Sequence, residues 1–185
     1  MKNYITLPAD KAYKLLNNGA IIMVATRDAQ KQPNLTPIAW HCPVDYEPVT
    51  RLLFVCDKKH KCFINILLAK KFVIVLPHAS QSQLVKDMGS VSGHKADKLK
   101  KFNTKTFPSA KYKYSIPEGC VGYIECKLEK IVSEKYVGIV FGRAVSAGVA
   151  RTAFKDRLLV NKAAGKTLHY LGSKLFYQPG DKLIT

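Results

Sequence analysis

Two long strand-like segments in the C-terminal half constrain the fold most. Cys120–Ile131 and Tyr136–Val145 are rich in β-branched and aromatic residues, and only a short polar stretch around Ser133 and Glu134 separates them. Long segments joined by so short a connection predict an antiparallel hairpin. A doubly wound α/β fold requires a regular alternation of strands and helices, which this hairpin breaks.

Shorter apolar runs predict the remaining strands. They are bounded by turn residues, and prolines close two of them, as expected for strands that end abruptly. The predicted strands are Ala20–Thr26, Leu35–Cys42 before Pro43, Arg51–Cys56, and Lys71–Leu76 before Pro77.

Three segments carry apolar residues at helical spacing. Pro8–Asn18 has a proline suited to the first turn and Gly19 as a natural stop, Lys58–Ala69 follows a strand, and a third helix begins at Ser80. Residues 89–113 are polar and lysine-rich, so we expect mainly loop there. Together these elements predict a largely antiparallel β-barrel decorated with short helices, in a single domain spanning residues 1–185.

Composition narrows the class of protein. Hydrophobic residues make up 47% of the chain and charged residues 23%, which is enough to bury a core and excludes wholesale disorder. The apolar runs are far shorter than the roughly 20 residues of a bilayer-spanning helix, so we expect no membrane span. The first ten residues lack the apolar region of a secretory signal, and the 5 cysteines form no C-x-x-C pair. We therefore expect free thiols and a cytoplasmic location.

The net charge of +17, from 30 Lys and Arg against 13 Asp and Glu, predicts an anionic partner. Nucleic acid, an anionic membrane face and a phosphate-bearing small molecule all fit this charge. The excess is mostly lysine, a solvated point charge, and this weakens the case for sequence-specific DNA recognition.

Familiar catalytic motifs are absent from the sequence. There is no G-x-S-x-G, Walker, H-E-x-x-H or G-x-G-x-x-G pattern, and Gly89–Gly93 lacks the glycine–serine order of a hydrolase elbow. A metal site formed by His41, Cys42, Cys56 and His60 is conceivable. Alternation along a strand instead directs His41 and Cys42 to opposite faces, so we predict no metal.

Lysines gather where a strand leads into a helix. Lys58–Lys61 stands at this junction, where free N–H groups and the helix dipole favour an anion. A second group, Lys95, Lys98, Lys100 and Lys101, follows Ser92-Gly93. We interpret the two groups as a phosphate site, although any one of these lysines could simply be solvated.

The strand that carries the single tryptophan has a polar face. Asn34 and Thr36 are two residues apart and therefore point to the same side. Ala39 would let a flat ring approach the backbone beside Trp40. An aromatic ligand lying along this strand is one interpretation, and a core tryptophan with a turn Asn and a capping Thr is the other.

The order and spacing of these segments resemble the flavin reductase-like, FMN-binding split-barrel family, and its flavoredoxin-like branch in particular. The resemblance covers about residues 20–180. It is carried by the segments Asn34–Trp40, Phe54–Lys61, Lys71–Pro77, Ser92–Lys98, Gly122–Cys126, Tyr136–Val145 and Leu168–Gly172, with Tyr177 and Gly180.

The resemblance implies a mainly β, six-stranded antiparallel Greek-key split barrel that binds FMN, usually as a homodimer. Strand Asn34–His41 would flank the isoalloxazine ring, and the loop Cys56–Cys62 with Lys98 would hold the phosphate. The implied cofactor-binding residues are Asn34, Thr36, Ala39, Trp40, His41, Cys56, Asp57, Lys58, Lys61, Cys62 and Lys98.

The family's chemistry implies an oxidoreductase that passes electrons between a reduced nicotinamide, NADH or NADPH, or a protein carrier and the bound flavin. No side chain needs to act as acid or base, because the cofactor supplies the reactivity. Two positions depart from the family pattern: Cys62 stands where a hydroxyl residue is common, and the strand Lys71–Leu76 ends in Leu76-Pro77 where Asn is common.

Three other functions stay open at this point. One is a basic nucleic-acid-binding module, to which Tyr112 and Tyr114 would contribute stacking surfaces. The others are a non-catalytic flavin carrier and a split barrel that holds heme or a pyridoxal-phosphate-like compound.

Overall fold

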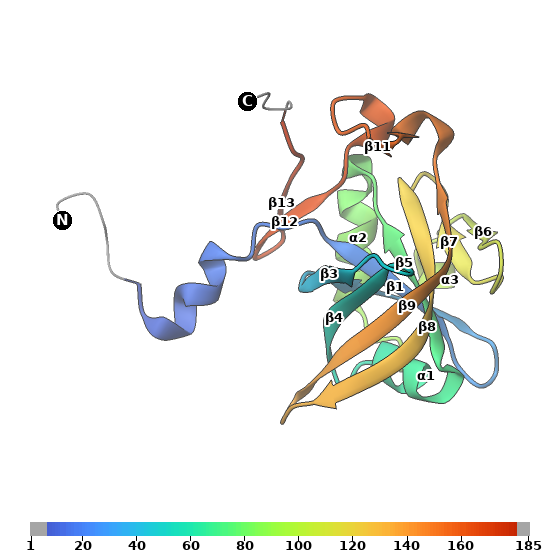
Figure 1. The fold of residues 1–185 in the computed structure, drawn as a ribbon. Coiled ribbons are helices and arrows are strands. Elements are labelled where there is room, and N and C mark those ends of the chain that lie inside the picture. Colours follow the sequence, from blue (N-terminus) through green and yellow to red (C-terminus); the bar gives the residue numbers. More distant parts are fainter. Residues whose placement is uncertain (1–6, 181–185) are drawn as a thin grey trace.

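The protein is described by a computed structural model over residues 7–180 (Figure 1). A seven-stranded antiparallel sheet runs in the order β2-β1-β5-β8-β9-β4-β3, which confirms the predicted mainly β, antiparallel class. Its strands are β1 (Ile22–Arg27), β2 (Pro33–Ile38), β3 (His41–Asp45), β4 (Arg51–Asp57), β5 (Lys71–Leu76), β8 (Gly122–Ser133) and β9 (Val137–Val149).

Short helices and hairpins surround this sheet. The α-helices are α1 (Lys61–Ala69), α2 (Ser82–Ser90) and α3 (Lys98–Lys101), and the 3-10 helices are η1 (Ala9–Leu15), η2 (Ala79–Gln81), η3 (Arg151–Ala153) and η4 (Ala163–Gly165). The peripheral strand pairs are β6 (Thr106–Pro108) with β7 (Ser115–Pro117), β10 (Phe154–Lys155) with β11 (Arg157–Leu158), and β12 (His169–Gly172) with β13 (Leu175–Tyr177).

The predicted strand Leu35–Cys42 is broken in two. β2 pairs with β1 at one edge of the sheet, and β3 pairs with β4 at the other. Ala39 and Trp40 carry the chain between these edges, and Pro43 lies inside β3 instead of closing a strand. The sheet is therefore not closed by hydrogen bonds, and the expected six strands become seven because one of them changes partner midway.

The predicted hairpin is confirmed. β8 and β9 pair from Gly122 opposite Val149 to Ser133 opposite Gly138, with two register shifts that bend the ladder. The hairpin joins β5 to β4, so it forms the middle of the sheet. Both strands continue past the C-terminal ends expected from the sequence.

Apolar side chains form a core on each face of the sheet. Val24, Phe54 and Phe72 belong to the inner core, which α1 covers through Phe63 and Ile66. Met23, Val73 and Val75 point to the other face and pack with Val85 and Met88 of α2. Strands β1 and β5 are apolar at nearly every position because both of their faces are covered.

Two expectations outside the sheet are corrected. The predicted helix Pro8–Asn18 is the 3-10 helix η1, which extends away from the sheet and buries none of its residues (Figure 1). Residues 89–113, expected to be loop, contain α3 and β6. Lys98 and Leu99 of α3 are buried, so this segment packs against the body despite its polar composition. Within residues 7–180, no helix is long and apolar enough to cross a bilayer.

Candidate functional site

A cleft of about 310 Å³ opens between β2, the start of α1 and the segment that follows α2. Four residues predicted from the sequence line it: Asn34, Thr36, Lys61 and Lys98. The phosphate interpretation placed two of them, and the polar strand face placed the other two. The fold therefore joins two predictions in a single cleft.

The polar face of β2 forms one wall of this cleft. Asn34 and Thr36 are buried, and the Asn34 Nδ2 donates a hydrogen bond of 3.0 Å to the Thr36 Oγ1. Behind them, the Asn65 Nδ2 donates to the Thr26 Oγ1 at 3.0 Å. Within the part of the chain that the structure describes, the buried Asn34 Oδ1 accepts no hydrogen bond. A buried acceptor without a donor is costly, so this oxygen is suited to a ligand N–H.

The opposite wall approaches β2 closely at Gly93. A Cβ atom at this position would overlap the amide oxygen of Asn34. The segment is held toward the start of α1 by a hydrogen bond of 3.1 Å between the His94 Nε2 and the Lys59 carbonyl. Glycine is therefore required here so that the backbone can pass beside Asn34.

Positive charge is concentrated at the floor of the cleft. Lys98 is only 4% exposed, and its Nζ donates to the Met88 carbonyl at 2.7 Å. Burial lowers the pKa of Lys98 to about 8. Lys61 pairs with Asp28 at 2.9 Å across the rim. Within residues 7–180 no side chain caps the start of α1, where His60 is the N-cap residue, so its first N–H groups are available to an anion.

The predicted residues of the β4–α1 turn lie beside the cleft and do not line it. The Asp57 Oδ1 accepts a hydrogen bond of 2.8 Å from the Lys59 N–H, and Lys58 donates to the Glu134 carbonyl. Cys56 and Cys62 are fully buried behind the turn. These contacts give Asp57 and Lys58 a part in shaping the turn.

Ala39, Trp40 and His41 lie elsewhere, around a separate hollow of about 300 Å³. Trp40 is 52% exposed and its ring meets that of Tyr13 edge-on, so the alternative of a core tryptophan is wrong. The His41 Nε2 lies 2.7 Å from the Ala20 carbonyl, and burial lowers the pKa of His41. The predicted ring-flanking strand is thus divided between two surfaces.

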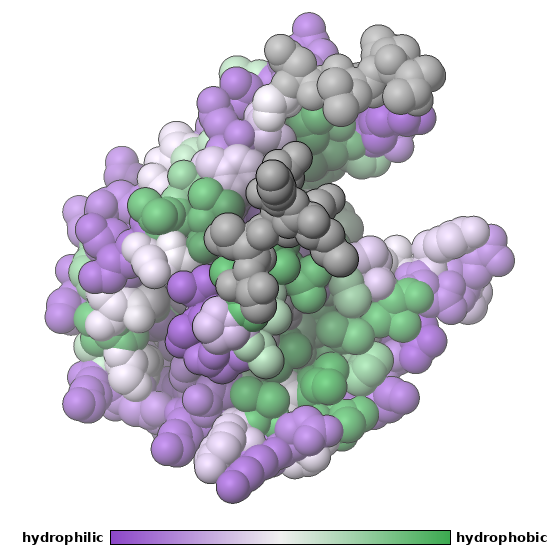
Figure 2. All heavy atoms as spheres, turned by 90° about the vertical axis from the view of Figure 1, so that its left-hand side faces the viewer, coloured by the Kyte–Doolittle hydropathy of each residue, from purple (hydrophilic) through white to green (hydrophobic). Residues whose placement is uncertain are grey.

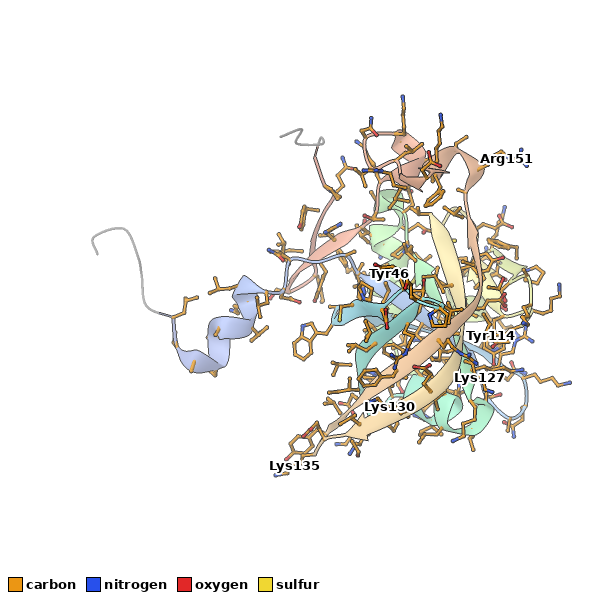
Figure 3. All side chains as sticks on the ribbon, viewed as in Figure 1. Tyr46, Tyr114, Lys127, Lys130, Lys135 and Arg151 are labelled. Atoms are coloured by element: carbon orange, nitrogen blue, oxygen red, sulfur yellow. The ribbon has the colours of Figure 1, made fainter. Side chains whose placement is uncertain are left out.

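The remaining positive charge is spread over the molecule. Figure 3 labels Lys127, Lys130 and Lys135 along the β8–β9 hairpin and Arg151 near its other end. The net charge therefore does not mark the cleft by itself. What distinguishes the cleft is that one of its lysines is buried.

Sequence reasoning missed the stretch from Met88 to Val91, which lines the cleft. This part of the wall comes from the end of α2, and no residue type in it signals a ligand. The G-x-x-x-G shape of Gly89–Gly93 was the available signal, and it marks a close chain approach instead of a nucleophile.

Comparison with known proteins gives a consistent result. Residues 17–173 match the family described as the flavin reductase like domain. YddH of Escherichia coli (strain K12), a protein described as uncharacterized, is 32% identical over 191 residues, which cover 99% of this chain and 98% of YddH.

Solved structures agree with this match. The FMN-binding domain of a flavin reductases-like enzyme from Shewanella baltica OS155 is 27% identical, with a TM-score of 0.79 over 98% of this chain and 96% of that chain. Flavoredoxin of Desulfovibrio vulgaris (Miyazaki F) shares the fold with a TM-score of 0.80 at 18% identity, over 100% of this chain and 95% of that one. The resemblance drawn from the sequence is confirmed.

Proposed function

The chain belongs to the flavin reductase-like family, and we propose that it is an FMN-binding oxidoreductase whose cofactor occupies the β2 cleft. It would pass electrons between a reduced nicotinamide or a protein carrier and the flavin. The observation that carries this proposal is the meeting of an unpaired buried acceptor, Asn34 Oδ1, with a buried cation, Lys98, in one cleft.

The residues of the cleft fit the two chemical ends of FMN. The isoalloxazine ring carries an N–H donor on its pyrimidine edge, and Asn34 Oδ1 would accept it. The phosphate would be held by the uncapped start of α1 together with Lys61 and Lys98. Gly93 leaves room for the backbone to pass close to both β2 and the ligand.

Of the predicted cofactor-binding residues, we assign to direct contact the four that line the cleft: Asn34, Thr36, Lys61 and Lys98. Cys56, Asp57, Lys58 and Cys62 would support the turn that presents the start of α1. This division rests on which side chains reach the cleft and which are hydrogen-bonded elsewhere.

The protein's own contribution to catalysis would be position and electrostatics. Bound flavin supplies a two-electron centre that accepts hydride from nicotinamide. Lys98 places a positive charge in a largely buried site, where it acts more strongly than in water and favours an anionic ligand. Thr36 and Asn34 keep each other oriented through their mutual hydrogen bond.

We further propose that the protein is a homodimer. Leu15 and Leu16 at the end of the η1 arm are 68% and 84% exposed, and Trp40 lines the same hollow as Leu16. Figure 2 faces this side of the molecule and shows hydrophobic residues gathered on it. A second copy of the chain that covers this face would bury these side chains, and we assign Ala39, Trp40 and His41 to this interface.

The test is to purify the protein and add FMN. We expect a yellow complex, and we expect its flavin absorbance to bleach anaerobically with NADH or NADPH. Bleaching with neither nucleotide would reduce the proposal to a flavin carrier. A protein that ignores FMN and binds DNA tightly at low salt would refute the proposal in favour of a nucleic-acid module.

A further inference from the structure

We propose that Cys56 and Cys62 form a second redox site, a dithiol that closes to a disulfide and exchanges two electrons with flavin in the adjoining cleft. The inference rests on the proposed function for its electron partner. The closure of the disulfide itself depends only on residues of this chain.

The two thiols are brought together by the β4–α1 turn. Cys56 is the second-last residue of β4 and Cys62 the second residue of α1, and their side chains hydrogen-bond to each other. The turn between them is fixed by the His60 N–H, which donates to the Asp57 carbonyl at 3.0 Å. A sulfur–sulfur bond would therefore shorten a contact that already exists.

The surroundings of the pair separate the charge states of the two thiols. Hydrogen bonds from Cys62 and His60 lower the pKa of Cys56 to about 6, although burial opposes this. The His60 Nδ1 lies 3.9 Å from the Cys56 Sγ, and this contact raises the pKa of His60. The same thiol contact and burial raise the pKa of Cys62 well above its usual value. At neutral pH the pair is a thiolate beside a thiol, the combination that thiol–disulfide chemistry uses.

The other cysteines lack these features. Burial raises the pKa of Cys120 to about 11 and that of Cys126 to about 12, so both are inert thiols. Cys42 is exposed on β3.

The flavin cleft is the route to this pair. Cys56 and Cys62 are 1% and 0% exposed, so bulky oxidants in solution do not reach them in the folded protein. Cys62 hydrogen-bonds to Thr36, which lines the cleft, and Lys98, another lining residue, interacts with the Cys62 charge. The cleft therefore lies directly over Cys62.

The reaction balances without a further reagent. The Cys56 thiolate and the Cys62 thiol form one S–S bond, and the S–H bond of Cys62 breaks. The pair loses two electrons and one proton, and oxidised flavin gains both electrons and that proton. The reverse reaction returns two electrons from reduced flavin to the disulfide.

The experiment counts thiols in a Cys42→Ser background, which leaves four of the five cysteines. FMN-free protein is first treated with the small oxidant diamide, denatured, alkylated and mapped by mass spectrometry. Fully reduced protein is then mixed anaerobically with oxidised FMN, and disulfide-containing protein with photoreduced FMN. Cys56→Ser and Cys62→Ser are the variants, with Cys56→Ala and Cys62→Ala as replacements if the serine forms do not fold. Cys120→Ser is the matched control.

We expect diamide to produce a Cys56–Cys62 disulfide in the parent and in Cys120→Ser, and in neither variant. With FMN, the thiol counts from the two starting states should converge on one value, because a true equilibrium is reached from both sides. No disulfide with diamide overturns the proposal. A disulfide whose count does not change while FMN is bound overturns the electron exchange. Failure to bind FMN refutes the proposed function and removes the electron partner, whereas the diamide result still decides whether the dithiol closes.

Discussion

Gly93 and the Asn34 side chain are so close that a methyl group on Gly93 would occupy the space of the Asn34 amide oxygen. The loop after α2 and strand β2 therefore form a single surface, held together at this contact. That surface contains the unpaired acceptor assigned to the flavin ring.

Gly93→Ala is expected to weaken FMN binding by about tenfold or more, equivalent to roughly 1.4 kcal/mol. The added methyl group forces Asn34 to rotate or the loop to move, and either change misaligns the acceptor. Fluorescence titration of FMN measures the effect. Gly180→Ala is the control, since a Cβ atom there has no neighbour within 4 Å. Equal affinity in the two variants would remove Asn34 from the ring site.

Lys98→Met should lower FMN affinity about 10- to 100-fold, because a hydrogen bond to a charged group contributes roughly 1.5–3 kcal/mol. Methionine preserves most of the buried volume, so folding should persist. Lys100→Met, an exposed change on the same helix, should leave the affinity unchanged. If both variants bound FMN like the parent, Lys98 would not meet the phosphate.

The affinity for FMN should also depend on pH through Lys98. Its pKa of about 8 means that the free protein loses this positive charge as pH rises past 8. Affinity is therefore expected to decline between pH 7 and pH 9 in the parent. The groups facing Lys98 are the Met88 carbonyl and Cys62, and Lys98→Met should abolish its share of the slope. An identical decline in the variant would assign the slope to another group.

Local patterns predicted those elements whose neighbours reinforce their own preference. Lys71–Leu76 is β-rich, covered on both faces and followed by a proline, and β5 has these same bounds. Alternation likewise predicted that Asn34 and Thr36 share a face. The break at Ala39 and Trp40 was not predictable, because it arises when one continuous strand must serve two edges of the sheet.

The candidate site was predictable in its residue types and only partly in its membership. Lys98 lies 64 positions after Asn34, and only packing of α3 against β2 brings them together. Trp40 follows Thr36 by four positions and yet lies on another surface, because the chain leaves β2 at Ala39 and enters β3. Closeness along the chain therefore did not reveal which of these side chains share a site.

Glu125 should make the stability of the fold depend on acid pH. This carboxylate is fully buried, and it accepts hydrogen bonds from the Ser109 Oγ at 2.7 Å and from the Lys111 N–H at 2.9 Å. Burial alone would raise the pKa of Glu125, but these hydrogen bonds and that of Tyr112 outweigh it and lower the pKa below the usual 4.5. The ionised form therefore stabilises the fold above pH 4.5, and this contribution is lost as pH falls through the lowered value.

Glu125→Gln is expected to cost about 1–3 kcal/mol at pH 7, because an amide N–H₂ would face the N–H donors of the 109–112 segment. Urea denaturation at pH 7 and pH 4 measures this, and the variant should lose less stability on acidification than the parent. Glu129→Gln, which removes the partly exposed pair with Arg51, should cost less than about 1 kcal/mol. A parent and a Glu125→Gln variant with the same acid response would show that another group controls it.

The exposed arm provides the final prediction. Leu16 is 84% exposed beside Trp40, and burying one leucine in an interface contributes roughly 1.5–3 kcal/mol. Leu16→Asp should therefore shift the dimer toward monomer by about tenfold or more in its dissociation constant, as measured by sedimentation velocity across protein concentrations. Leu68→Asp is the matched control, since Leu68 is 66% exposed on α1 and does not line the hollow at Trp40. A parent protein that sediments as a monomer, or an equal shift in both variants, would contradict the assignment of this face to a second copy.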